Sequence, residues 1–160
     1  MNNLLQLITF LILSTSFSQS ILDKKLDKYE GFFDFYYDVS TDKIYLEVEN
    51  LNSEFLYINS LATGIGSNDI GLDRGQLGNE RLVSFQKAGN KLLLIQPNLS
   101  FRANTDNKAE EKSIKQAFAK SVIYGFKILE TNNKKYLIDF TSFLMQDKHG
   151  VAERLKRSKQ

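Results

Sequence analysis

Alternation of apolar and polar residues is the dominant pattern along the chain, and it predicts strands joined by short turns. In the segment 32–39 the apolar side chains Phe33, Phe35, Tyr37 and Val39 fall on one side of an extended backbone. A second alternating segment follows at 43–49, after the polar residues 40–42. The two segments together predict a β-hairpin.

Five further strands are predicted, at 54–62, 81–87, 91–96, 123–130 and 135–140. The strand at 54–62 has apolar residues on both faces, which is typical of a central strand. The turn residues at 88–90 and 131–133 each favour a hairpin between the strands that flank them.

One amphipathic helix is predicted between Ala109 and Val122, because apolar residues recur there at helical spacing from Ile114 onward. Asn107 fits the N-cap position, with Glu110 three residues later as in a capping box. We expect the apolar face of this helix to pack against the sheet.

The order of elements predicts an α+β fold: a largely antiparallel, curved β-sheet of about seven strands, with one main amphipathic helix and a short C-terminal helix. The expected division is a signal peptide at 1–18, a lead-in segment at 19–28, a β-rich domain at 29–146 and a basic helical tail at 147–160. A short helix is expected near 141–145, inside the β-rich domain.

The N-terminal residues have the features of a secretory signal. The run from Leu4 to Leu13 is apolar but too short to span a bilayer, and Ser16 and Ser18 supply small residues before a cleavage site at Gln19. We therefore expect an exported protein, periplasmic or extracellular, with no stable membrane span after signal cleavage. The alternative is a buried N-terminal helix.

Composition excludes several kinds of chemistry. Lys plus Arg is 21 and Asp plus Glu is 19, so the formal charge of 21 − 19 = +2 is too small to favour nucleic acid as a partner. With one His and no Cys, the chain lacks the ligands of a hydrolytic zinc site, and a Ser-His-Asp triad would have to use the same His149. We expect His149 to be a solvated helix-end residue, and we expect no catalytic residue, metal or cofactor in this chain.

A long glycine-rich loop is predicted from Thr63 to Gly78. Its start resembles a phosphate-binding turn, but the third glycine and the following helix pattern are missing. Long loops in compact domains are commonly functional, so we take the polar residues of this loop as the candidate interface or cleft residues: Asn68, Asp69, Asp73, Arg74 and Gln76. A purely structural loop, pinned by an ion pair between Asp73 and Arg74, and a weak calcium site are the open alternatives.

Two features of the first hairpin also admit a functional reading. Asp34 and Asp38 resemble a glycosidase carboxylate pair, although a solvated strand face explains them better. The aromatic residues Phe32, Tyr36 and Tyr45 would suit a sugar-binding platform, although ordinary cross-strand pairing is the commoner role.

Four segments carry a resemblance to a known family: KYEGFFDFYYD, EFLYINSLATGIGSNDIGLDRGQLGNERLVSF, LLLIQPNLSFRA and QDKHGVAERLKR. Through them the chain resembles the N-terminal domain of unknown function of large secreted bacterial zinc-dependent metalloproteases, the zincin type whose HExxH lies downstream. The resemblance covers most of Lys28 to Arg157, and the loop SNDIGLDRGQLG is its most distinctive part. It carries no catalytic residue onto this chain.

The resemblance implies a supporting role. The chain would be the non-catalytic N-terminal fragment of such a protease, its partner would be the downstream metalloprotease domain of the same polypeptide, and zinc would be bound only there. A peptide substrate is a further partner that the resemblance suggests. The rival hypothesis is a free-standing secreted module that binds a glycan or a peptide.

Overall fold

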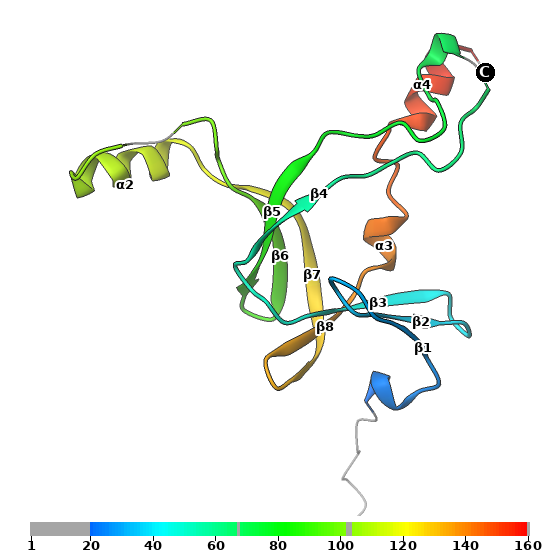
Figure 1. Ribbon diagram of the computed structural model, residues 1–160, viewed down its shortest axis with the longest axis horizontal. Coiled ribbons are helices and arrows are strands. Elements are labelled where there is room, and N and C mark those ends of the chain that lie inside the picture. The colour runs from blue at the N-terminus through cyan, green and yellow to red at the C-terminus, as the bar shows by residue number, and fades with distance from the viewer. Residues whose placement is uncertain (1–19, 67, 102–103, 160) are drawn as a thin grey trace, which may run out of the picture.

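The computed structural model describes residues 20–66, 68–101 and 104–159, and these residues form one eight-stranded antiparallel sheet (Figure 1). The predicted signal peptide at 1–18 lies outside the described residues. Along the sheet the strand order is β1-β2-β3-β8-β7-β6-β5-β4. The strands are β1 (Asp27–Tyr29), β2 (Phe35–Asp38), β3 (Lys43–Val48), β4 (Glu54–Tyr57), β5 (Arg81–Ala88), β6 (Lys91–Gln96), β7 (Ser121–Asn132) and β8 (Lys135–Asp139).

Within these described ranges, three α-helices and two short 3₁₀ turns accompany the sheet. They are η1 (Ile21–Asp23), η2 (Asn68–Ile70), α2 (Lys108–Ala117), α3 (Thr141–Leu144) and α4 (Val151–Arg157). The predicted α+β class with a curved antiparallel sheet is confirmed.

The connection between β3 and β4 requires the sheet to curl. These strands follow each other in the chain, yet five strand-to-strand steps separate them in the sheet, which is about 24 Å in a flat sheet. The connecting residues 49–53 reach at most about 20 Å when fully extended, and they include a turn at Asn52 with φ of 61°. The two ends of this part of the sheet therefore approach each other, and the Asn52 amide donates to the Phe85 carbonyl of β5 at 2.8 Å. The result is a half-barrel.

The core fills the inside of this half-barrel. Phe85 and Phe126 are each 2% exposed, and Val48, Leu92 and Ile138 are fully buried beside them. Aromatic rings then continue the core from one strand to the next. Phe85 lies between Phe33 and Phe126, with ring centroids 5.6 and 6.0 Å apart.

Local turn chemistry explains the hairpins. Gly89 at the β5–β6 turn has φ of 60°, and Asn133 and Lys134 at the β7–β8 turn have φ of 47° and 66°. Left-handed residues at both central positions of the β7–β8 turn, and a left-handed glycine at the first central position of the β5–β6 turn, match the twist of a tight hairpin. Both hairpins were predicted, the second with its turn one to two residues too early.

The lead-in segment contains η1 and ends in β1, an edge strand that was not predicted, and the Ser20 hydroxyl donates to Glu130 of β7 at 2.6 Å. Two predictions about the strands were wrong. The strand predicted at 54–62 as central is the short edge strand β4. Val39, predicted on the apolar side of a strand, lies in a turn and is 64% exposed.

The helix α2 also departs from its prediction. Asn107 caps it as expected, accepting from the Ala109 amide at 2.9 Å, but the helix ends at Ala117 and has no buried residue. It projects away from the half-barrel as an arm (Figure 1), at whose base Phe101 and Phe118 stack with centroids 4.0 Å apart. The amphipathic pattern was real, but this helix does not pack on the sheet.

No helix in the described ranges is long and apolar enough to cross a membrane.

Candidate functional site

An open apolar pocket of about 580 Å³ lies at one end of the half-barrel. Its floor is formed by core side chains, including Leu46, Phe85 and Leu94. One wall is β4 with the extended residues 58–61, and the other is the segment 140–151, which contains α3. This volume and lining match those of common ligand pockets.

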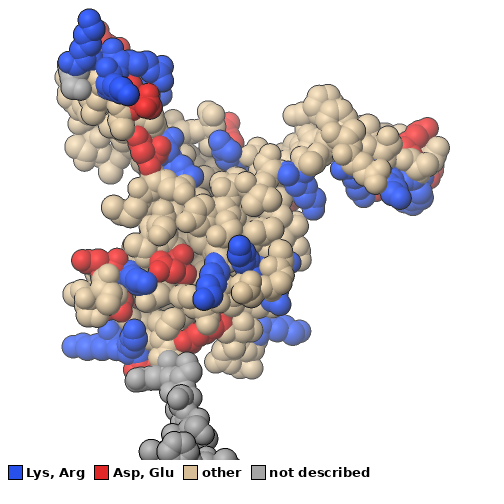
Figure 2. All heavy atoms as spheres, turned by 180° about the vertical axis from the view of Figure 1, so that it is seen from behind, with Lys and Arg blue, Asp and Glu red and all other residues tan. Residues whose placement is uncertain are grey.

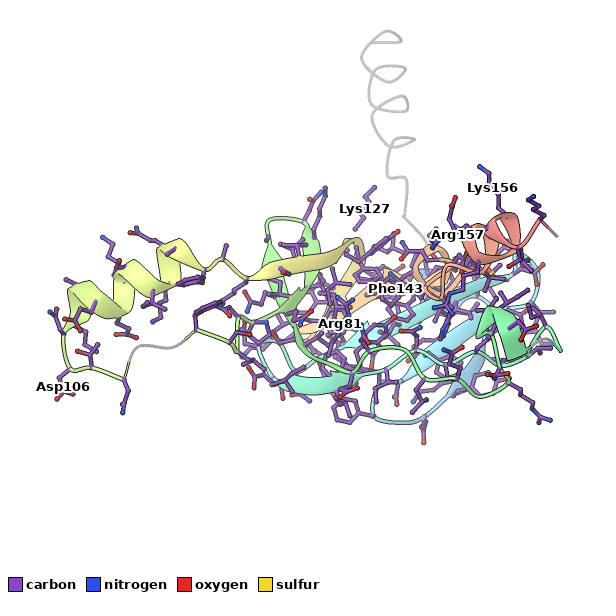
Figure 3. All side chains as sticks on the ribbon, turned by 90° about the horizontal axis from the view of Figure 1, so that it is seen from above. Arg81, Asp106, Lys127, Phe143, Lys156 and Arg157 are labelled. Atoms are coloured by element: carbon purple, nitrogen blue, oxygen red, sulfur yellow. The ribbon has the colours of Figure 1, made fainter. Side chains whose placement is uncertain are left out.

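Local sequence explains the two walls. In β4 the side chains alternate, so that Phe55 and Tyr57 turn toward the core and Leu56 remains 63% exposed. On the other wall Phe143 of α3 is buried, and its ring contacts Phe126 at 5.5 Å between centroids. Figure 3 labels Phe143 near the middle of the molecule.

Most polar side chains of the pocket lining come from two short segments, 59–60 and 146–149, which we call its rim. The Lys148 Nζ lies 4.7 Å from the centroid of the Phe143 ring, a cation–π contact. Desolvation by its neighbours, followed by repulsion from Arg81, lowers the pKa of Lys148. An ammonium in this position favours an anionic group nearby, since such a group would offset both effects.

His149 and Asp147 are also at this rim, and each is engaged within the protein. The His149 Nε2 lies 2.9 Å from the Asn59 Nδ2, across the pocket wall. The Asp147 carboxylate accepts from the Val151 and Ala152 amides at 2.8 and 3.0 Å. It therefore caps α4. The prediction that His149 is a solvated helix-end residue was wrong, because it is half-buried and bonded to Asn59.

The predicted loop 63–78 contributes no residue to the pocket lining and packs against α4 (Figure 1), although its end pairs with the pocket wall at Ser60. Leu72 is fully buried, and the Arg154 Nη1 of α4 donates to the Gly71 carbonyl at 2.7 Å. A Cβ atom at Gly64 would lie 2.7 Å from the Arg74 amide nitrogen, so the loop is closely packed on itself. These contacts fix the loop in place.

The candidate residues of this loop are brought together only in part. Asp69, Asp73 and Arg74 are exposed, whereas Gln76 is half-buried and its Oε1 is buried without a hydrogen-bond partner. Asn68 begins the turn η2. Among the described residues Asp73 and Arg74 form no ion pair.

The loop and α4 together form a charged end of the molecule. Figure 2 shows Lys and Arg side chains gathered at this end, where α4 has Arg154, Lys156 and Arg157 in its last turn.

The other candidate residues of the first hairpin have local structural roles. Tyr36 and Tyr45 are cross-strand partners, and Tyr45 is 4% exposed, so no three-residue sugar platform forms. Asp34 pairs with Lys28 at 3.1 Å. Asp38 is buried, contrary to the expected solvated face, and hydrogen bonds from Ser40 are the main cause of its lowered pKa.

The pocket was missed by sequence reasoning, because its lining comes from separate segments with no shared motif. Phe32 was noted only as a platform residue, and Lys148 was not singled out. Within the ranges that the structure describes, no three His, Cys, Asp or Glu side chains group as metal ligands.

Comparison with known families gives two matches. The model of a domain of unknown function, DUF5117, matches residues 75–160, more than half of the chain. The chain belongs to the DUF5117 family. A second domain of unknown function, DUF5118, matches residues 15–64. No curated protein and no solved structure matches this DUF5117 chain.

The two matches divide one sheet. The DUF5118 match contains β1 to β4, and the DUF5117 match contains β5 to β8 with the three α-helices. The ladders β3–β8 and β4–β5 join the two matched regions, and both regions line the pocket. The loop residues 65–74, which hold most of the predicted site, lie between the matches. The resemblance to a domain of unknown function is thus confirmed in its general form.

Proposed function

We propose that this chain is the non-catalytic N-terminal region of a secreted zinc-dependent metalloprotease and that it supports folding or cleft formation of a catalytic domain downstream in the same polypeptide. The resemblance of its segments to such N-terminal domains supports this function. The amino-acid content agrees with it, because one His and no Cys leave no ligand set for a hydrolytic zinc ion.

The fixed position of the loop 63–78 is the observation that carries the proposal. A docking surface works best when rigid elements fix it, and here Leu72 is buried while Arg154 ties the loop backbone to α4. Asp73 and Arg74 remain exposed on this support. A domain that followed α4 in the polypeptide would begin close to this loop, because Arg154 bonds α4 to it. We infer that the loop contacts the catalytic domain.

Substitution of Arg74 by Ala in the parent protease tests this role. We expect proteolytic activity to fall several-fold while the melting temperature of this region changes little, because the Arg74 side chain is exposed and supports no packing. Lys91→Ala is the matched control, since Lys91 is an exposed cation at the β5–β6 hairpin, outside the loop and α4. Equal activities of the two variants would refute a docking role for the loop.

The pocket favours a second candidate, a free-standing secreted module that binds a peptide or a glycan. Its apolar lining, built from Phe55, Phe143 and their neighbours, has the character of a binding site. Reading the gene beyond Gln160 separates the candidates. A downstream HExxH supports the protease region, and a stop codon at that point supports the free-standing module.

A further inference from the structure

The outer edge of β4 continues as an unpaired edge along the pocket. β4 is the last strand in the sheet order, so one side of it has no neighbouring strand among the described residues. Leu56 and Ile58 are 63% and 40% exposed along this stretch. Exposed apolar edges of this kind readily pair with another extended chain.

Ladder geometry shows which backbone groups are free. Ser60 forms an isolated antiparallel bridge with Leu77, flanked by the bonds from the Leu61 amide to the Gln76 carbonyl at 2.9 Å and from the Gly78 amide to the Asn59 carbonyl at 2.7 Å. In such a non-hydrogen-bonded pair, the N–H and C=O groups of Ser60 itself point away from its partner strand.

Ser60 therefore presents a donor and an acceptor at the free edge, and by strand alternation Ile58 does the same. Within the described part of the chain neither residue makes a backbone hydrogen bond outside the named elements. Both residues line the pocket. The free backbone groups of Ile58 and Ser60 therefore lie next to the apolar pocket.

Charge at the rim restricts what can bind. Lys148 supplies a cation over the Phe143 ring, whereas the nearby carboxylate of Asp147 is occupied by the first amides of α4. An occupant with an apolar body and a carboxylate complements this combination.

We propose that this groove binds an extended peptide from a protein substrate, which adds as a strand along 56–60, inserts a bulky apolar side chain between Phe55 and Phe143, and places a carboxylate beside Lys148. Main-chain bonds supply affinity in this mode, and the side-chain pocket supplies sequence preference. That the peptide is a substrate rests on the proposed function, but its binding does not. No residue of the loop 63–78 lines the pocket, and Arg74 makes no contact with it, so the two proposals fail separately.

Fluorescence anisotropy with the full chain and a short labelled peptide tests the binding. The peptide alternates valine and threonine, with a central phenylalanine and a glutamate two residues later, so that both side chains lie on the same face of the strand. Two further versions carry N-methyl groups on one or the other alternate set of backbone amides. A strand bonded along one edge uses only one set. We expect the unmethylated peptide to bind saturably. One methylated version should bind at least about tenfold more weakly, and the other should keep the affinity of the unmethylated peptide.

Lys148→Gln tests the charge. It should lower the affinity for the glutamate peptide about fivefold and leave the affinity for a glutamine version unchanged. Lys127→Gln is the control and should change neither affinity, because Lys127 is an exposed cation on β7 outside the pocket lining. Absence of saturable binding would overturn the proposal, as would equal binding of both methylated peptides. Self-association of the chain that the peptide does not displace would show that a second copy occupies the edge, which would also overturn it.

Discussion

Truncation of Phe85 should unfold both family-matched regions together. Phe85 is 2% exposed on β5, in the DUF5117 match. Its ring lies 5.6 Å from those of Phe33 and Phe55, which belong to the DUF5118 match, and 6.0 Å from that of Phe126. The side chain therefore connects the core across the two matches.

The expected loss for Phe85→Ala is about 3–5 kcal/mol, the usual cost of removing a buried phenylalanine. A domain is stable by only about 5–15 kcal/mol, so the variant should be marginal. Amide protection should fall by about 10²- to 10⁴-fold. The decrease should be the same in β3 and in β6, because one cooperative unit contains both strands.

Hydrogen exchange measured by mass spectrometry checks this result, with urea unfolding followed by circular dichroism as the measure of total stability. Phe85→Leu is the matched control and should cost only about 1.5 kcal/mol, since most of the volume is kept. If β6 lost protection while β3 kept it, the two matched regions would be separate folding units, and the reasoning from the shared core would be refuted.

Two further predictions concern the loop and α4. Gly64→Ala should lower the free energy of unfolding by about 1–3 kcal/mol, measured by urea titration, because the new Cβ would lie 2.7 Å from the Arg74 nitrogen. Gly31→Ala is the control and should lower it less, because its Cβ would meet the nearest atom at 3.5 Å. Hydrogen bonds from the Val151 and Ala152 amides lower the pKa of Asp147 below its ordinary 3.8, so its stabilisation of α4 is complete above that pH and is lost as the pH falls through the folded pKa. The Ala152 amide resonance should report this titration by NMR, and a titration that persisted in Asp147→Asn would assign it to another group.

Local elements of this fold were predictable, because their signals lie within a few residues. The short apolar run at 92–95 and the turn at Gly89 indicate β6 and its hairpin without reference to the rest of the chain. Asn107, as an N-cap residue, likewise indicates the start of α2.

Long-range arrangement was not predictable from the same signals. Nothing near Glu54 shows that β4 pairs with β5 at the far edge of the sheet. The apolar spacing around Ile114 predicts a helix but not what it packs on, and α2 has no buried residue. The pocket depends on the same long-range arrangement, because Asn59 and His149 are ninety residues apart in sequence. The glycine pattern points to the loop candidates, whereas Phe32 and His149 of the pocket lining are noted from sequence for other roles.

The ladders across the sheet have a consequence for proteolytic nicking. A cut within 65–74 would leave an N-terminal piece in which β3 and β4 are each still hydrogen-bonded to a strand of the C-terminal piece. The nicked molecule should migrate as one species in a native gel and as two bands in SDS. Expressed singly, each piece would expose strand edges that only the other can cover.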